Sequence, residues 1–345
     1  MIRINILSGS QSDPFFAHWD KERFPESEYY IVENSNEDIV WDAVVVYENI
    51  KRAFTVKCKE GNLFYFAGEP PLMRPLLDSF LQQFDKVIIP NKKSKHPHKI
   101  LSHGFLNWSL GVSFLTKKNK YSYRDFKNLD VSKSKNISIV TSTKKMMPGH
   151  NRRMYIIKKM KEDFPGQIDY FGMGSRAVDY KIDALLPYRF HICMENSTIP
   201  YYWTEKFADP IIAKSIPIYM GCTNVSDYFD TRGFFQCNYN DYKQLHDILT
   251  TVLKDPEGVY QQMLPYLEKN KQILMEEQNI IPYVIEKLYV PSNASATRTI
   301  MNQENFKFYK LSFLKIRIIR FAFKIIFSLT HSKKTDEKSF VYLET

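Results

Sequence analysis

The feature that most constrains the fold is a regular alternation of strand-like and helical segments between residues 136 and 220. Apolar, strand-like runs cover residues 136–141, 168–171, 189–194 and 216–220, and helical patterns cover 152–164, 178–186 and 204–214. Strands that are separated by a helix pair in parallel, because the chain must cross back over the sheet before the next strand begins. The pattern therefore predicts a parallel, Rossmann-like sheet whose ligand lies at the carboxyl ends of the strands.

The first part of the chain has a similar rhythm, with strands expected over residues 2–7, 42–47, 62–67 and 86–89 and a helix over 72–84. The length of 345 residues fits two domains, and 44% hydrophobic and 25% charged residues are typical of a globular protein. Residues 116–135 are rich in charge and poor in apolar side chains. We therefore expect an N-terminal domain over 1–134, a C-terminal domain over 135–300 and a tail over 301–345.

Motifs of several common enzyme classes are absent from the sequence. Neither half has a G-x-G-x-x-G after its first strand, and no G-x-x-x-x-G-K-[ST] occurs, so dinucleotide oxidoreduction and P-loop hydrolysis lose support. There is no Asp-x-Asp, and His96 and His98 have no Cys, Asp or Glu at ligand spacing, which indicates a solvated loop rather than a metal site. The four cysteines form no C-x-x-C pair and are expected to be reduced.

The most informative stretch covers residues 189–221. A strand is followed by an aromatic-rich segment, and Thr-Glu-Lys at 204–206 then begins a helix. The free N–H groups at the start of a helix attract anions, and Lys206 adds a full positive charge. Glu205 can accept hydrogen bonds from ribose hydroxyls, and the aromatic residues before the helix offer a stacking face. This pattern predicts a site for a nucleotide with a diphosphate.

The same stretch resembles the signature of glycosyltransferase family 10, the α-1,3/1,4-fucosyltransferases, in its bacterial type. The resemblance rests on E-N-S at 195–197, Y-W-T-E-K at 202–206 and I-P-I-Y-M-G at 216–221. It extends back through residues 149–160 and 168–172, and weakly into the first domain at 62–71. It implies an α/β fold of the GT-B class, in which two Rossmann-like domains have the active site in the cleft between them. It also implies GDP-fucose as the donor and an inverting mechanism that requires no cofactor and no essential divalent metal.

The resemblance further assigns roles to individual residues. Asn196, Tyr202, Glu205 and Lys206 match positions that contact the donor. Three of them also have a structural interpretation, since Glu205 and Lys206 could be a solvated helix start and Tyr202 could be a packing residue. Glu195 is interpreted as structural.

Two residues outside this stretch complete the predicted site. Arg153 matches the arginine on the diphosphate, and its neighbour Arg152 is the alternative one residue away. Glu69 matches the proposed general base of the family. An inverting transfer needs one carboxylate to take the proton of the acceptor hydroxyl. It also needs cations to stabilise the departing diphosphate. As alternatives, Arg153 could be a surface residue and Glu69 a turn residue.

The tail combines basic and apolar residues at helical spacing. Residues 301–345 contain nine Lys and Arg and four Asp and Glu. Their net charge of 9 − 4 = +5 is half of the +10 of the whole chain. Over residues 305–329 the pattern predicts a basic amphipathic helix that is too charged to cross a membrane. We expect it to bind an anionic membrane surface, and packing against the C-terminal domain is the alternative.

Together these patterns predict an inverting α-1,3-fucosyltransferase that moves L-fucose from GDP-fucose to a hydroxyl of a surface glycan, glycolipid or lipid-linked oligosaccharide, without a nucleic-acid partner. The alternatives are an inverting transferase for another nucleotide sugar, and a non-catalytic basic protein that binds nucleic acid or an anionic surface. The first residues lack the pattern of a signal peptide. A glycan on the sequon at 196–198 would block the predicted donor site. The expected location is therefore cytoplasmic, peripheral on the inner face of the cell membrane.

Overall fold

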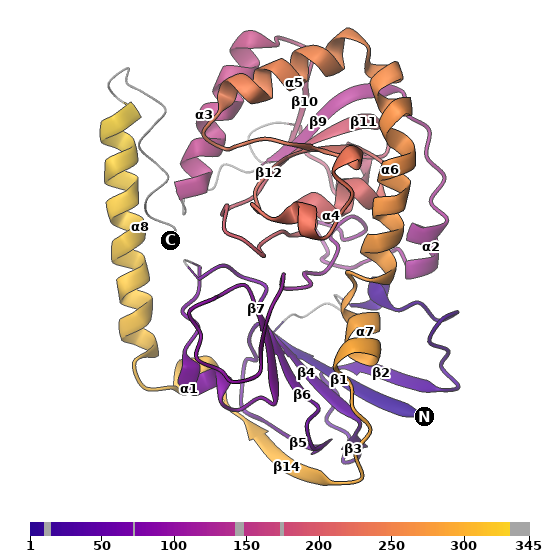
Figure 1. Cartoon of the computed structure of the whole chain (residues 1–345), viewed down its shortest axis with the longest axis vertical. Helices are drawn as coiled ribbons and strands as arrows, with labels where there is room; N and C mark the ends of the chain where they lie inside the picture. The colour runs from indigo at the N-terminus through magenta and orange to yellow at the C-terminus, as the bar shows by residue number, and fades with distance from the viewer. Residues whose placement is uncertain (10–14, 72, 142–147, 173–175, 332–345) are drawn as a thin grey trace. The chain divides into compact units, whose positions relative to one another are not determined.

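The computed structural model describes residues 1–9, 15–71, 73–141, 148–172 and 176–331. The chain divides into two compact units (Figure 1), and both are discontinuous in sequence. The first unit contains Met1–Asn107, Ser122–Arg124 and Glu276–Arg317, and the second contains Trp108–Tyr121, Asp125–Met275 and the chain from Ile318 on.

The first unit is built on two sheets and short helices. Its elements are β1 (Ile2–Ser8), η1 (Phe16–His18), β2 (Tyr29–Glu33), β3 (Val40–Trp41), β4 (Ala43–Tyr47), β5 (Phe54–Lys59), β6 (Leu63–Phe66), α1 (Asp78–Leu81), β7 (Lys86–Ile89), β8 (Lys99–Leu101), α7 (Ile280–Tyr283), η5 (Val284–Leu288), β14 (Ser295–Ile300) and η6 (Gln303–Asn305). The larger sheet has the order β2-β1-β4-β6-β7-β8 and every neighbouring pair is parallel. The strands predicted over 2–7, 42–47, 62–67 and 86–89 all lie in this sheet.

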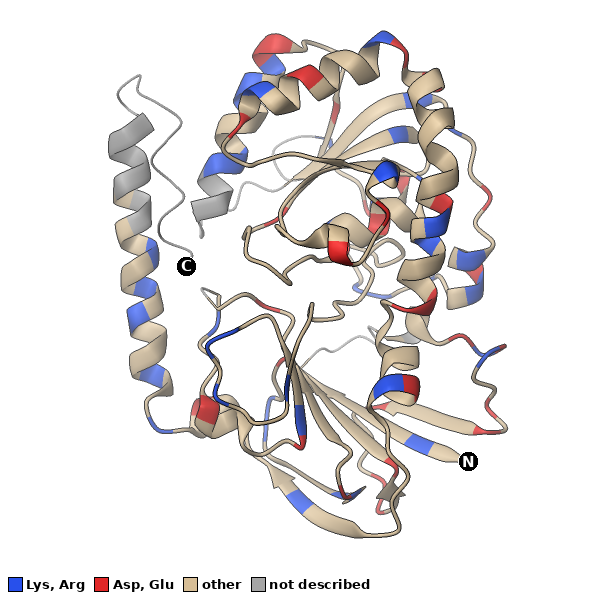
Figure 2. Ribbon diagram, viewed as in Figure 1, with Lys and Arg blue, Asp and Glu red and all other residues tan. Residues whose placement is uncertain are grey.

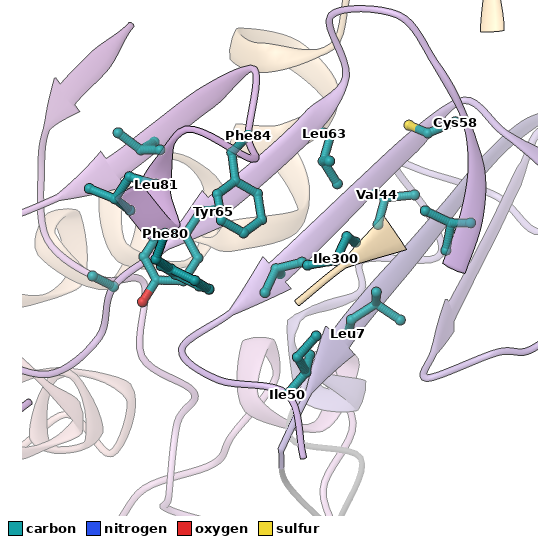
Figure 3. Packing of buried hydrophobic residues seen from close by; sticks show 14 of the residues in the cluster. Leu7, Val44, Ile50, Cys58, Leu63, Tyr65, Phe80, Leu81, Phe84 and Ile300 are labelled. Atoms are coloured by element: carbon teal, nitrogen blue, oxygen red, sulfur yellow. The ribbon is translucent and has the colours of Figure 1, made fainter. Parts of the chain in front are cut away.

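The core of the first unit lies on both faces of this sheet, because its central strands are buried throughout. Every residue of β4 and β6 is buried. On one face, Tyr65, Phe80 and Phe84 form a cluster of aromatic rings with centroids 5.1–5.3 Å apart (Figure 3). Ile300, from β14, packs into the same cluster (Figure 3). A strand that comes more than 200 residues after β6 therefore contributes to the core of the first unit.

The chain returns to the first unit after Glu276, which differs from the expected boundaries at 134/135 and 300/301. Strand β14 pairs antiparallel with β5, from Ser295 opposite Lys59 to Ile300 opposite Phe54. The apolar residues of α7 and η5 pack against the other face of the large sheet. Burial of these side chains and the ladder of backbone hydrogen bonds hold residues 276–300 in the first unit rather than in the C-terminal one.

The second unit is built on one parallel sheet of order β10-β9-β11-β12-β13. Its elements are β9 (Lys135–Thr141), α3 (Pro148–Asp163), β10 (Asp169–Gly172), η2 (Lys181–Ala184), β11 (Tyr188–Met194), α4 (Glu205–Ile212), β12 (Ile216–Met220), η3 (Val225–Asp227), η4 (Thr231–Gly233), β13 (Phe235–Gln236), α5 (Tyr242–Lys254) and α6 (Pro256–Glu276). Helix α2 (Tyr123–Lys127) falls within the predicted junction 116–135. Two units with central parallel sheets confirm the predicted GT-B class of two Rossmann-like domains.

Two predicted helices are much shorter than expected. The described part of the segment 72–84, which begins at residue 73, contains only α1, because Pro75 has no backbone N–H and disfavours helix in the residue before it. The segment 178–186 contains only the 3-10 turn η2. Its backbone is bonded elsewhere, since Phe114 donates to the carbonyl of Asp179 at 2.8 Å and Ile182 donates to that of Leu110 at 3.2 Å.

Helix α4 contains Pro210, which has no backbone N–H to continue the helical hydrogen bonds. The helix ends two residues later, at Ile212. The N–H of Ser215 then donates to the carbonyl of Pro210 at 2.8 Å. Because the proline lies in the last turn, the start of the helix at Glu205 is unaffected.

Helix α8 (Tyr309–His331) follows η6 and corresponds to the helix that was predicted over residues 305–329. Apolar residues on α8 recur every three or four positions on an exposed stripe, comprising Leu311, Leu314, Ile318, Phe321 and Ile325. Lys310, Lys315 and Arg317 are exposed on the same helix. Figure 2 shows basic positions in blue along its described part. In the part of the chain that the structure describes, the helices are all too short or too polar to span a membrane.

Candidate active site

A cavity of about 690 Å³ lies within the second unit. Its walls include the carboxyl-terminal residues of three adjacent parallel strands, Thr141 of β9, Gly172 of β10 and Met194 of β11. This edge of a parallel sheet is where ligands bind in Rossmann-like folds. The volume is that of a typical small-molecule site. The position agrees with the ligand site that the β-α-β pattern predicted.

The start of helix α4 is fixed to the end of β11 by a buried carboxylate. Glu195 accepts hydrogen bonds from the backbone N–H of Thr204 at 2.8 Å and from its hydroxyl at 2.8 and 2.9 Å. The Thr204 hydroxyl in turn accepts from the N–H of Lys206 at 3.2 Å, as an N-cap. Burial raises the pKa of Glu195 to about 7. Glu195 is thus a structural residue that orients the helix start, as the sequence indicated.

Glu205 and Lys206 lie in the first turn of α4 and both line the cavity. The Nζ of Lys206 lies 3.0 Å from Oε1 of Glu205 and 3.6 Å from Oε2 of Glu195. Burial alone would raise the pKa of Glu205, but Lys206 and Lys181 outweigh it and lower this pKa to about 2. Glu205 is therefore ionised at neutral pH and can only accept hydrogen bonds, which suits the hydroxyls of a ribose or sugar.

A buried ion pair that the sequence did not reveal lies beneath this helix. Lys181, in η2, donates to Oδ2 of Asp209 at 2.8 Å, and the two side chains are only 7% and 0% exposed. Asp209 also accepts from the backbone N–H of Ser109 at 3.0 Å. Burial raises the pKa of Asp209 to about 6 although Lys181 lowers it. Lys181 also lines the cavity, so it adds a further cation there.

The two neighbouring arginines of α3 have different surroundings. Arg153 is buried and lines the cavity, and burial lowers the pKa of its guanidinium. Arg152 instead donates from Nε to the carbonyl of Tyr239 at 2.8 Å. The structure therefore brings Arg153 together with Glu205 and Lys206, at the end of the sheet.

The other two predicted donor residues are placed differently. Tyr202 is buried, with 3% of its surface exposed, and Asn196 is partly exposed. Neither belongs to the described residues that line the cavity. The buried position of Tyr202 favours its interpretation as a packing residue, and its predicted contact with the donor stays a prediction.

Glu69 lies in the first unit, three residues after the end of β6. It lines a small pocket together with Glu48, Arg74 and Pro71. The pocket thus gathers two carboxyl groups and one guanidinium at the carboxyl end of a parallel strand. The predicted cleft between the domains, with Glu69 facing the donor, stays a prediction.

The structure changes the interpretation of His96. Its side chain is buried rather than solvated, and Nε2 lies 3.1 Å from the carbonyl of Phe84. Among the residues that the structure describes, no group of three or more His, Cys, Asp or Glu could hold a metal ion. The four cysteines are buried free thiols.

The two parallel sheets define the fold class, and the cation-lined cavity defines a candidate site for an anionic ligand. Residues 131–281 match the model of glycosyltransferase family 10 (fucosyltransferase), C-terminal part, which confirms the resemblance for this segment of the chain. An α-(1,3)-fucosyltransferase of Helicobacter pylori is 32% identical over 89 residues, which are 25% of this chain and 18% of that protein. The matched segment therefore spans less than a fifth of the length of this relative.

Solved structures with similar folds include two of an α1,3-fucosyltransferase. The complex with GDP has 17% identity and a TM-score of 0.47, covering 84% of this chain and 92% of the other. The complex with GDP-fucose has 17% identity and a TM-score of 0.46, covering 98% and 92%. A protein of Anabaena, Alr3699/HepE, solved with UDP and glucose, has 9% identity and a TM-score of 0.44, covering 82% and 97%. The fold assignment rests on the sheets described above.

Proposed function

We propose that this protein is an inverting fucosyltransferase that transfers L-fucose from GDP-fucose to a saccharide hydroxyl. The observation that carries the proposal is the cavity at the carboxyl edge of the second sheet. It is lined by the cations Arg153, Lys181 and Lys206 and by the ionised Glu205. These groups suit a diphosphate and a ribose. The match of residues 131–281 to the fucosyltransferase family supports fucose as the sugar.

The proposed chemistry is a single displacement. Glu69 takes the proton of the acceptor hydroxyl, and the hydroxyl oxygen attacks the anomeric carbon of fucose on the face opposite GDP. The bond from this carbon to the diphosphate oxygen breaks, and GDP leaves with the electron pair. Arg153 and Lys206 are placed in advance to stabilise the charge that accumulates on the diphosphate. Because these cations supply that charge, we propose that a divalent metal is not essential.

The proposal is tested by binding and by transfer. Isothermal titration with GDP, GDP-fucose, GDP-mannose and a short DNA duplex should show binding of GDP and GDP-fucose and none of DNA. Labelled GDP-fucose should then transfer fucose to a panel of soluble oligosaccharides, with inversion at the anomeric carbon and with activity retained in EDTA. Binding of DNA without GDP, or preferential transfer from another nucleotide sugar, would contradict the proposal. Complete loss of activity in EDTA that Mg²⁺ or Mn²⁺ restores would contradict the metal-independent mechanism.

Replacement of Lys206 by alanine should weaken GDP binding by about 10- to 100-fold, since a hydrogen bond to a charged group contributes roughly 1.5–3 kcal/mol. The measurement is titration with GDP, together with thermal unfolding. A matched control is Lys214→Ala, because Lys214 is similarly exposed and pairs with Glu268 at 2.9 Å. This control should bind GDP normally. Unchanged GDP affinity in Lys206→Ala, with a lower melting temperature, would show that Lys206 is only structural.

We further propose that α8 holds the protein to an anionic membrane surface on the cytoplasmic side, beside a glycolipid or lipid-linked acceptor. Support comes from the exposed apolar stripe on α8 and the exposed Lys310, Lys315 and Arg317 beside it. An amphipathic helix of this kind inserts its apolar side chains at the lipid interface while its basic side chains attract anionic headgroups.

The triple variant Lys310→Gln, Lys315→Gln, Arg317→Gln should reduce binding to vesicles that contain phosphatidylserine. Each basic residue near the surface contributes roughly 1 kcal/mol, so the loss should be on the order of 100-fold. The measurement is co-sedimentation, and the control replaces the exposed Lys158, Lys243 and Lys269 by glutamine. Equal binding by both triple variants would contradict the membrane proposal. Point substitutions are preferable to deletion of residues 301–345, because Gln303 is fully buried and its removal would disturb the packing of the first unit.

A further inference from the structure

Glu48 directly follows strand β4 and its side chain bridges two groups in the pocket of Glu69. One carboxylate oxygen, Oε1, accepts a short hydrogen bond from the backbone N–H of Glu69. The other, Oε2, accepts from Nη1 of Arg74 at 3.1 Å. The Glu48 side chain is only 16% exposed, so both contacts are shielded from water. Charge-assisted hydrogen bonds of this kind are stronger than neutral ones.

The backbone of Glu48 is itself held in an unusual conformation. Its φ is 60°, in the left-handed region that most side chains avoid. Its N–H donates to the carbonyl of Phe66 at 2.8 Å, and its carbonyl accepts from the hydroxyl of Tyr65 at 3.0 Å. These bonds to β6 fix the point from which the side chain reaches toward Glu69.

The turn that carries Glu69 approaches this carboxylate closely because the preceding residue is glycine. A Cβ at Gly68 would lie 3.1 Å from Oε1 of Glu48 and 2.8 Å from the hydroxyl of Tyr47. On another side, a Cβ at Gly104 would lie 2.3 Å from the Cα of Gly68. The main chain at Gly68 is therefore packed closely against Glu48 on one side and Gly104 on another, which leaves no room for a larger residue at Gly68.

Burial of a carboxylate beside a second carboxyl group is unfavourable unless something compensates for it. Burial raises the pKa of Glu48 to about 7, Arg74 lowers it and Glu69 raises it further. A residue that only filled this space would be better replaced by an apolar side chain. The arrangement is accounted for if the carboxylate is needed to hold the N–H of Glu69.

We infer that Glu48, paired with Arg74, is a positioning residue that holds the main chain of Glu69 in the geometry required for proton transfer. The inference rests on the proposed function, in which Glu69 is the general base. A general base must lie within about 2.6–3.2 Å of the proton that it removes. A displacement of about 1 Å can lower the rate by roughly 10²-fold. A bond to the backbone of the base limits such displacement.

The chain contains a matched control for this bridge. Asp85 also accepts from a backbone N–H, that of Leu63 at 2.9 Å, and also pairs with an arginine, Arg298 at 3.4 Å. Its exposure of 22% is close to that of Glu48. Both bridges lie in the first unit, but the Asp85 bridge holds a core residue instead of the proposed base. Variants of the two residues therefore separate positioning from general stability.

The experiment compares Glu48→Gln and Glu48→Met with Asp85→Asn and Asp85→Met. Turnover of GDP-fucose is followed by release of GDP, with a soluble oligosaccharide or water as the acceptor, and GDP affinity and melting temperature are measured in parallel. Glu48→Met should lower kcat by about 10²-fold without changing the KM for GDP-fucose or the affinity for GDP. Glu48→Gln should lose less than about tenfold, since its amide oxygen can still accept the N–H of Glu69. The Asp85 variants should melt earlier but keep kcat.

The inference is overturned if Glu48→Met has the kcat of the wild type. It is equally overturned if Glu48→Gln is no better than Glu48→Met, or if the Asp85 variants lose kcat to the same extent. The proposed function itself fails if the wild-type protein does not bind GDP or does not turn over GDP-fucose. Because the inference depends on that turnover, it would then be rejected as well.

Discussion

Replacement of Glu69 by glutamine is expected to lower turnover of GDP-fucose by about 10² to 10⁴ while GDP affinity stays unchanged, because the amide keeps the size of the side chain but cannot take a proton. The measurement is the initial rate of fucose transfer at saturating donor, beside titration with GDP. Glu60→Gln is a suitable control, since Glu60 is exposed in a turn of the same unit. Near-normal turnover by Glu69→Gln would show that Glu69 is not the general base.

Replacement of Asp209 by asparagine is expected to lower the free energy of unfolding by about 3–5 kcal/mol, because it leaves the buried ammonium of Lys181 without its counter-charge. The measurement is urea denaturation. Asp247→Asn is the control, since its pair with Lys243 is exposed and should contribute at most about 1 kcal/mol.

The double variant Asp209→Asn, Lys181→Met should recover much of this stability, because the buried charge is then absent. Its GDP affinity should nevertheless stay below that of the wild type, since Lys181 also lines the cavity. If Asp209→Asn lowers the free energy of unfolding by less than about 1 kcal/mol, the ammonium of Lys181 must be hydrogen-bonded to water or to another group in that variant.

Strands β9, β10, β11 and β12 of the second unit could be predicted because each is a short apolar run bounded by polar residues, whereas the two-residue strand β13 was not predicted. Strands β9, β11 and β12 begin within one residue of the predicted starts. The helix expected over 178–186 could not be excluded in the same way. Its backbone groups pair with residues 110–114, and this pairing depends on chain segments that are far apart in sequence. Helical spacing of side chains carries no information about such a competing partner.

The candidate site was predictable where its residues follow one another along the chain. Glu205 and Lys206 begin a helix directly after a strand, and the structure places both beside Arg153 in the cavity. Lys181 and Asp209 were missed because each looks like an ordinary surface residue in the sequence. Their roles depend on burial and on the hydrogen bond between them, which joins residues 28 positions apart. A local sequence pattern does not predict such a contact.

The return of the chain to the first unit at Glu276 has a consequence for synthesis on the ribosome. The first unit cannot complete its smaller sheet until β14 has emerged, since β5 needs that strand as its antiparallel partner. The second unit needs no residue between 276 and 317, so its parallel sheet and cavity can form earlier. Domains usually fold in the order of their synthesis. Here the smaller sheet of the first unit is completed after the sheet of the second unit, and a nascent chain stopped near residue 281 would display an open edge at β5 that favours aggregation.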